Sequence, residues 1–498
     1  MLFVYFFVRD TMKFYLKHEQ FDSIQLYIKN IINLYFEESY LFEGVGDNQI
    51  NLNIEQKDET TVTTTMTING KTYTQSAKRN GVTKRDMKQA LGETLITILT
   101  DYTGIVQSWG TLTGIRPTKL YHKYYRQGLT HEEITKILVR DYLISIEKID
   151  LMRDIVHTQL TAMPDLYQLE REVSIYIGIP FCPTKCAYCT FPAYAIRVFK
   201  DQVPEFLVGL IHEIKHTAAW LKDNDIKVTS IYFGGGTPTS IEPKDLSLLL
   251  ETVYTSFDMT HVREVTVEAG RPDTIDTETL NVLNHYDIDR ISINPQSFTD
   301  ATLKAIGRHH SVQQTIDKFQ LSRAHHMNNI NMDLIIGLPN ETRVEVENSL
   351  QETKKLNPES LTVHTLSFKT ASEMTRNKAK YPVAPRDEII HMMNMTRQFA
   401  IENDYIPYYL YRQKNILGNL ENIGYSKQDE ASLYNILIME EVQTIIGLGC
   451  GASSKLIDPV TGKIENFLNP KDPKSYNNSY ESYTDKKIEK LTQCYTSI

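Results

Sequence analysis

The sequence predicts an α/β protein built around six β/α units, whose parallel sheet forms an incomplete barrel or an open α/β sheet, with an α+β domain before it and a mostly helical domain after it. From residue 173 onward, short runs rich in β-branched residues alternate with longer amphipathic segments. Such near-continuous apolar or β-branched runs are typical of parallel strands in a sheet that is buried on both faces. Repeated strand–helix units favour right-handed connections, and they gather functional groups at the carboxyl ends of the strands.

Six strands are expected in this block, and helical patterns follow several of them. The expected strands are residues 173–179, 228–233, 263–269, 289–294, 330–336 and 360–366. The clearest helical patterns are residues 204–221, 244–257 and 302–324. Residues 166–385 are therefore interpreted as the barrel.

The segments on either side of the barrel read differently. Residues 48–56 and 60–75 alternate polar and apolar positions around an Asn69-Gly70 turn, which predicts antiparallel hairpins. Helical patterns at 83–104 and 131–160 complete an expected accessory domain over residues 1–165. Residues 386–498 begin with a helical pattern at 386–404 and are expected to form a C-terminal domain on the substrate side.

Composition bounds the class of protein. With 41% hydrophobic and 23% charged residues and a net charge of −9, the chain reads as a soluble globular protein with no basic face for nucleic acid. The apolar run at 2–8 is too short to span a bilayer and lacks the features of a signal peptide, so no membrane span is expected, and the start could lie at Met12. Five cysteines form no disulfide framework, which favours a reducing, cytoplasmic location.

The strongest motif is C-x3-C-x2-C directly after the first barrel strand. Cys182, Cys186 and Cys189 can each bind one iron of a cubane cluster, which leaves the fourth iron open for another ligand. A structural zinc site is the alternative, but zinc needs four ligands, and neither the loop nor His157 or His212 supplies the fourth at a suitable spacing. Unliganded core thiols are the remaining alternative.

Polar residues follow the later strands at positions where a barrel would bring them together. Several of them also have a simpler interpretation. The glycines could form a turn, the glutamate could be a solvated strand end, and the arginine could be a surface residue. Only an acid inside an apolar strand, such as Asp333, needs a partner in any case. The candidates are Gly235, Gly236, Thr237, Glu268, Gln296, Arg308 and Asp333.

The cysteine loop, with Tyr188 before its last cysteine, resembles that of the radical S-adenosylmethionine (SAM) superfamily. The stretches SIYIGIPFCPTKCAYC, YFGGGTPT, VTVEAGRP, DRISINPQSF, LKAIGRHHS and NMDLIIGLP are similar, more narrowly, to the oxygen-independent coproporphyrinogen III oxidase family. WGTLTGIRPTKL (109–120) in the first domain resembles the HemZ-type coproporphyrinogen dehydrogenase branch.

The resemblance implies a [4Fe–4S] cluster whose open iron chelates SAM, and a 5′-deoxyadenosyl radical that abstracts hydrogen. The implied reaction of haem biosynthesis converts two propionates of coproporphyrinogen III to vinyls, and an electron donor such as flavodoxin or ferredoxin supplies the reductant. Tyr176 would contact the sulfonium, while Gly235, Gly236 and Thr237 would hold the methionine end. The remaining polar groups would be bound by Glu268, Gln296, Arg308 and Asp333, supported by Ser367 and the GLGCGAS turn.

The tetra-anionic substrate of that reaction requires cationic anchors. Candidates are Arg412 and Lys414, in YLYRQKN, and Arg116 and Lys119, in GIRPTKL. Ordinary solvated charges are the alternative for each.

Two positions depart from the family pattern. Gly178 stands where the family has histidine, and Phe191 stands where the oxidases carry a fourth cysteine. Phenylalanine at that position is shared with a sister branch of haem chaperones, for which His309 or His310 could serve as an axial ligand. A haem chaperone and a radical SAM enzyme with another substrate are therefore the alternative functions.

Overall fold

The computed structural model describes residues 12–36, 39–114, 116–369 and 371–495. Two compact units divide the chain, one up to Asp154 and the other from Ile155 onward. The apolar run at 2–8 lies outside the described residues, and Met12 is the first residue of strand β1.

The N-terminal unit contains a five-stranded sheet in the order β2-β1-β3-β4-β5. β3 pairs antiparallel with β4, and β4 with β5, which confirms the expected hairpins. Asn69 (φ 49°) and Gly70 (φ 78°) form the turn with the positive φ values that a tight hairpin needs. The strands are β1 (Met12–Leu16), β2 (Ser39–Glu43), β3 (Gln49–Gln56), β4 (Thr60–Ile68) and β5 (Lys71–Arg79).

Helix α2 packs against β4 and β5 and buries the core of this unit. It begins at a Thr83–Asp86 capping box and ends at Gly104 in the left-handed conformation. The single helix expected over 131–160 is two helices, because Leu143 adopts φ 57° and ends α4. The helices are α1 (Phe21–Ile32), α2 (Lys84–Thr103), α3 (Thr118–Tyr125) and α4 (His131–Tyr142), and α5 (Ile146–Ala162) continues past Asp154 into the second unit.

The larger unit is organised by one sheet in the order β14-β15-β13-β12-β11-β10-β9-β6-β16-β17-β18. Its central strands from β13 to β16 are all parallel, and among the described residues the edge strands β14 and β18 do not pair with each other. All six predicted barrel strands are confirmed. They are β6 (Glu172–Ile179), β9 (Lys227–Gly235), β10 (Glu264–Glu268), β11 (Arg290–Ser292), β12 (Ile330–Ile336) and β13 (Ser360–Thr365).

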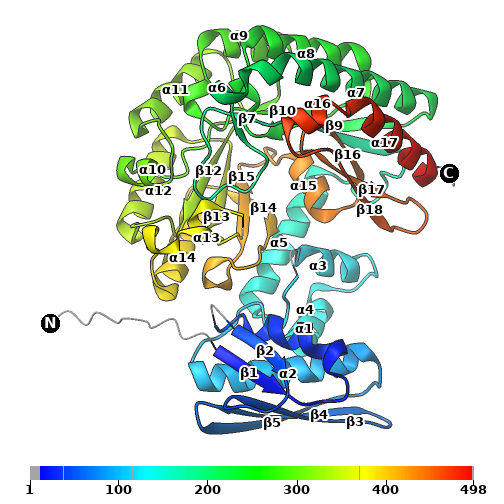
Figure 1. Ribbon diagram of the computed structural model, residues 1–498, viewed down its shortest axis with the longest axis vertical. Helices are drawn as coiled ribbons and strands as arrows, with labels where there is room; N and C mark the ends of the chain where they lie inside the picture. Colours follow the sequence, from blue (N-terminus) through cyan, green and yellow to red (C-terminus); the bar gives the residue numbers. More distant parts are fainter. Residues whose placement is uncertain (1–11, 37–38, 115, 370, 496–498) are drawn as a thin grey trace. The chain divides into compact units, whose positions relative to one another are not determined.

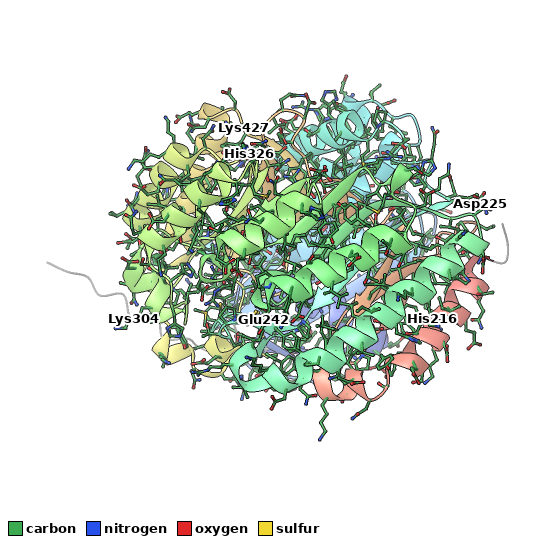
Figure 2. All side chains as sticks on the ribbon, turned by 90° about the horizontal axis from the view of Figure 1, so that it is seen from above. His216, Asp225, Glu242, Lys304, His326 and Lys427 are labelled. Carbon is green, nitrogen blue, oxygen red and sulfur yellow. The ribbon has the colours of Figure 1, made fainter. Side chains whose placement is uncertain are left out.

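Helices connect these strands and cover the outer face of the sheet (Figure 1). Neighbouring helices pack side by side, and exposed side chains such as His216 on α7 and Lys304 on α10 point to the outside (Figure 2). The pattern expected as one helix over 302–324 is divided into α10 and α11, which leaves Arg308 in the loop between them. The helices are α7 (Val203–Asp223), α8 (Pro243–Ser256), α9 (Thr277–His285), α10 (Asp300–Ala305), α11 (Val312–Ala324) and α12 (Arg343–Leu356).

Residues 386–498 belong to the same compact unit as the barrel and extend its sheet at both edges. Besides helices, the described part of this segment supplies five strands, of which β16 pairs parallel with β6. None of the described helices has both the length and the apolar content of a membrane span. The elements are α14 (Arg386–Glu402), β14 (Ile406–Tyr411), β15 (Asn422–Ser426), α15 (Leu433–Glu440), β16 (Thr444–Gly449), β17 (Ser453–Ile457), β18 (Ile464–Leu468), α16 (Pro473–Asn477) and α17 (Tyr480–Tyr495).

Candidate active site

The three clustered cysteines line one cavity of about 470 Å³ at the carboxyl ends of the barrel strands. The loop that carries them leaves β6 and returns as β8 (Tyr194–Ala195), which pairs with β7 (Phe181–Cys182). All three thiols are free. Burial raises the pKa of the Cys182 thiol to about 11 and also raises that of Cys189.

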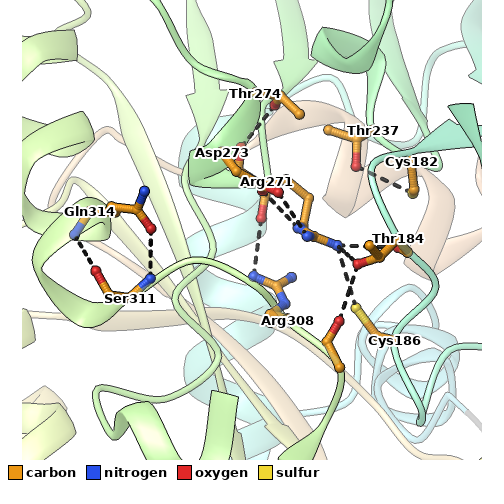
Figure 3. Close-up of polar contacts among 12 residues, drawn as sticks. Cys182, Thr184, Cys186, Thr237, Arg271, Asp273, Thr274, Arg308, Ser311 and Gln314 are labelled. Carbon is orange, nitrogen blue, oxygen red and sulfur yellow. Dashed lines mark hydrogen bonds and ion pairs between the residues drawn. The ribbon is translucent and has the colours of Figure 1, made fainter. Parts of the chain in front are cut away.

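The glycine-rich end of β9 is bound directly to the cysteine loop. Gly236 N donates to Ile179 O at 2.8 Å, and Thr237 N donates to Phe181 O at 2.7 Å. A Cβ on Gly236 would lie 2.4 Å from Phe181 O, so only glycine allows this approach. The contact places the Thr237 hydroxyl 3.4 Å from the Cys182 sulfur (Figure 3).

Glu268, the last residue of β10, lines the cavity and accepts a hydrogen bond from the Tyr232 hydroxyl at 2.6 Å. Burial raises the pKa of this carboxyl to about 7, and the Tyr232 hydrogen bond offsets only part of that effect. The group therefore changes charge close to neutral pH, unlike a solvated strand end.

Asp333, on β12, also lines the cavity but is shifted in the opposite direction. Burial by itself would raise its pKa, but its partners His364 and Asn331 lower it below the usual value. His364 Nε2 lies 3.5 Å from Asp333 Oδ2, and Asn331 Nδ2 donates to Oδ1 at 2.8 Å. The cavity thus holds one ionised and one readily protonated carboxyl.

Gln296 adopts φ 67° just after β11 and is fixed by its backbone. Its N–H donates to Asp333 O and its carbonyl accepts from Ile335 N, both at 2.9 Å. The side chain is buried and lines the cavity, and its Oε1 has no hydrogen-bond partner in the described part of the chain. A buried acceptor without a partner is suited to a ligand that donates.

Two buried arginines bind the loops around the cysteines. Arg308 Nη1 donates to the carbonyls of Gly270 and Asn294, and Arg271 pairs with Asp273 at 3.0 Å (Figure 3). Burial by itself would lower the pKa of Arg308, but Tyr188 and Cys186 raise it above its ordinary value. Both guanidinium groups therefore place permanent positive charge at the cavity wall.

Sequence reasoning missed several residues of the lining, although most lie next to a predicted strand end. Arg271 and Asn294 stand inside the quoted motifs VTVEAGRP and DRISINPQSF, and that placement was the available signal. His364 had no such signal, because the face of β13 that enters the cavity depends on strand register, and Lys369 lies in the loop after β13, outside the quoted motifs. The missed residues are Tyr232, Arg271, Ser292, Asn294, Asn331, His364 and Lys369.

Of four remaining candidates, one lines the cavity and three do not. The cavity lining does not include Tyr176, whose ring stacks on Tyr232 with centroids 6.2 Å apart, because the two residues are register neighbours on β6 and β9. Ser367 lines the cavity. Buried Arg412 donates to Asn419, and exposed Lys414 is not part of the lining.

Three other candidates have clear places in the fold. Arg116 and Lys119 belong to the N-terminal unit. The GLGCGAS turn joins β16 to β17 and packs against Gly178, where a Cβ would already meet Cys450 O at 3.3 Å. A side chain at residue 178 would therefore crowd this turn.

Residue 191, the other departure from the family pattern, lies at the cavity. The Phe191 ring lines it and is 58% exposed. His310 is buried and His309 is exposed, and neither lines the cavity.

The donor set suits a metal cluster, although no three His, Cys, Asp or Glu side chains of the described residues are gathered as ligands of a single metal ion. Arg271 Nη1 lies 3.9 Å from Cys186 Sγ, and Lys185 and Lys369 act electrostatically on Cys189. The two lysines offset part of the rise that burial causes in the pKa of Cys189, and iron binds the thiolate form.

Comparisons with known proteins agree with this site. The profile of the "Radical SAM superfamily" matches residues 176–353. "Oxygen-independent coproporphyrinogen-III oxidase-like protein HemZ" of Bacillus subtilis (strain 168) is 57% identical over 485 residues, which cover 95% of this chain and 97% of that relative. "Heme chaperone HemW" of Haemophilus influenzae is 28% identical over 323 residues, which cover 64% and 79% of the two chains.

A solved structure also has a similar fold. The coproporphyrinogen III oxidase HemN from Escherichia coli, a radical SAM enzyme, superposes with a TM-score of 0.52 at 21% identity. The match covers 66% of this chain and 73% of that one.

Proposed function

The chain belongs to the radical SAM superfamily and, within it, to the family of the coproporphyrinogen-III oxidase-like protein HemZ, and from this premise we propose that it oxidatively decarboxylates coproporphyrinogen III. Two propionate side chains would become vinyl groups, which yields protoporphyrinogen IX. The cavity that joins the three thiols to the polar strand ends is the observation that carries this proposal.

The family implies a [4Fe–4S] cluster and SAM as cofactors. Cys182, Cys186 and Cys189 would hold the cluster. When bound, the two cofactors would supply a 5′-deoxyadenosyl radical that takes a hydrogen atom from the propionate β-carbon. The hydrogen would end in 5′-deoxyadenosine, the bond to the carboxylate would break with loss of CO2, and a one-electron acceptor would take the remaining electron as the vinyl group forms.

The protein's own side chains would bind and orient the two ligands. Gln296 Oε1 and the Glu268 carboxyl can accept hydrogen bonds from an ammonium or from ribose hydroxyls, while Arg308 keeps the strand ends together through two carbonyls. Asp333 is held ionised by His364 and Asn331, so it offers a fixed negative charge to a cationic cofactor.

Lys369 is the best anchor for a substrate carboxylate. It lines the cavity, and its ammonium makes no ion pair with the described residues. Burial lowers its pKa, and the neighbouring Cys189 thiol counters this. An unpaired ammonium in a partly buried cavity can gain a charge-assisted hydrogen bond from a propionate.

Anaerobic turnover tests the proposal. Reconstituted protein with reductant, SAM and coproporphyrinogen III is expected to form protoporphyrinogen IX together with 5′-deoxyadenosine. Cys186→Ala should abolish both products, whereas Cys494→Ala, on α17, should retain them. Full turnover by Cys186→Ala would overturn the assignment of the cluster ligands.

A haem chaperone is the second candidate, and a specific observation favours it. Phe191 lines the cavity where the oxidases have a cysteine, and the relatives include a protein named heme chaperone. Stoichiometric haem binding without porphyrinogen turnover in the same assay would favour this function.

A further inference from the structure

The N-terminal unit contains a cavity of its own, of about 440 Å³, which the barrel chemistry does not use. Its volume lies in the range of small-molecule sites, about 300–1,000 Å³. All of its lining residues belong to the unit that ends at Asp154. They are Tyr27, Lys84, Arg85, Lys88, Gln89, Thr111, Leu112, Thr113, Gly114, Asp141 and Tyr142.

One wall is the start of the WGTLTGIRPTKL motif. Thr111 N donates to Tyr142 O at 2.8 Å, which holds this loop on the end of α4. Gly110 has φ 51°, and a Cβ there would lie 2.0 Å from Tyr142 O. Gly110 therefore lets the loop of this motif lie directly against the end of α4, at the wall of the cavity.

Helix α2, which supplies several lining residues, has a glycine in its interior. A Cβ on Gly92 would lie 2.3 Å from the Tyr27 hydroxyl and 2.8 Å from Thr111. Glycine in a helix interior costs about 1 kcal/mol relative to alanine, so a structural reason is needed for it. Here it makes room for the Tyr27 ring beside the Thr111 loop.

The charge of the lining is positive. The one lining carboxylate, Asp141, is already matched, since Arg140 Nε lies 2.6 Å and Arg85 Nη2 lies 3.5 Å from it. Lys84 and Lys88 make no ion pair with any described residue, and Lys88 Nζ lies 5.7 Å from the centre of the Tyr27 ring. Two ammonium groups at one cavity thus remain without a counter-charge.

Gln89 is the second sign of a ligand. It is 8% exposed and lines the cavity, and its Nε2 has no hydrogen-bond partner among the described residues. A buried donor left unpaired costs about 1–3 kcal/mol, and an acceptor on a ligand would recover that cost.

We propose that this cavity binds a small organic anion whose carboxylate or phosphate group lies between Lys84, Lys88 and the Gln89 amide and whose ring packs against Tyr27. The site is separate from the proposed porphyrinogen chemistry, so it can be tested in protein that carries no cluster. Three probes separate the parts of the ligand: uridine monophosphate, benzoate and inorganic phosphate.

Acetylation of lysines, read by peptide mass spectrometry of the full chain, locates the binding. Uridine monophosphate or benzoate should slow acetylation of Lys84 and Lys88 by about fivefold or more. Lys71, an exposed lysine on β5, should be unaffected. Protection by uridine monophosphate alone identifies a phosphate ligand, and protection by benzoate alone identifies a carboxylate ligand.

Two variants separate binding from folding. Gln89→Leu removes an amide nitrogen that has no partner in the described structure, so it should weaken binding of the protecting probe about tenfold or more without lowering the free energy of unfolding. Lys84→Ala/Lys88→Ala should weaken it similarly, and Lys71→Ala should not; the affinities of the variants are measured by equilibrium dialysis, because the double variant lacks the two lysines whose acetylation is read. The proposal is overturned if neither organic probe protects the two lysines, if inorganic phosphate protects them equally well, or if both variants bind as the wild type does.

Discussion

Arg271 Nη1 donates hydrogen bonds to the backbone oxygen and the hydroxyl of Thr184, at 3.2 and 3.1 Å (Figure 3). The two residues join the end of β10 to the loop that carries the cysteines. Arg271 Nε and Nη2 also donate to the two carboxylate oxygens of Asp273, both at 3.0 Å. Because both sides of the guanidinium are bound, the arginine holds the cysteine loop in place.

Arg271→Lys should weaken the contacts with Asp273 and Thr184 and should keep the positive charge. Lysine cannot bind Asp273 and Thr184 with a planar fork, so we expect a loss of about 2 kcal/mol in the free energy of unfolding and faster loss of iron to a chelator. Arg263→Lys, which breaks a half-exposed pair with Asp165 before the same strand, is the control and should change neither iron loss nor stability by as much. Equal effects of the two substitutions would contradict the claim that Arg271 holds the cysteine loop in place.

Gly236→Ala should separate β9 from the cysteine loop. Its Cβ would lie 2.4 Å from Phe181 O, so the backbone must move, at a cost of about 2 kcal/mol or more. The amount of iron bound after anaerobic reconstitution should fall together with the free energy of unfolding. Gly178→Ala meets its neighbours only at 3.3 Å and should lose less on both measures.

Glu268→Gln should alter how stability depends on pH. In the folded protein the pKa of Glu268 is about 7, above the ordinary value of 4.5, so the folded state binds the proton more tightly. Its contribution to stability is therefore present below pH 4.5 and is lost as pH rises through 7, a change of up to about 3 kcal/mol. Urea unfolding of cluster-free Glu268→Gln across that window should show a smaller decline than the wild type.

Glu341→Gln is the matched control for that variant. Burial also raises the pKa of Glu341 to about 7, but this carboxyl binds Ser297 and does not line the cavity. Both variants should flatten the stability profile, and only Glu268→Gln should weaken SAM binding, by about tenfold. Weakened SAM binding in both would assign Glu268 an indirect role.

Lys369→Met should raise the KM for coproporphyrinogen III by about tenfold, since one charge-assisted contact with a propionate is lost. SAM affinity should stay unchanged, and KM is compared at equal iron content because Lys369 also acts on the Cys189 thiol. Lys414→Met, on an exposed residue outside the cavity lining, is the control. A larger effect of Lys414 than of Lys369 would restore the anchor that the sequence favoured.

Much of this architecture could be predicted from the sequence because barrel strands and strand ends have local signals. β-branched runs located all six strands, and motifs beside them located Glu268, Gln296 and Arg308. The stacking of Tyr176 on Tyr232 and the entry of His364 into the cavity depend on register between strands far apart in sequence. No local pattern encodes that register.

Helix ends and domain edges were less predictable for a related reason. Leu143 ends α4 in a left-handed conformation that a leucine rarely adopts, while the apolar pattern continues into α5. Strands β14–β18 join the barrel sheet through pairings that only the folded chain reveals.

The fate of one hydrogen tests the central claim most directly. Coproporphyrinogen III deuterated at the propionate β-carbons is incubated anaerobically with the reconstituted protein, reductant and SAM, and the 5′-deoxyadenosine is analysed by mass spectrometry. The proposed reaction predicts deuterium in the 5′-deoxyadenosine, together with protoporphyrinogen IX. Unlabelled 5′-deoxyadenosine with intact substrate would contradict it.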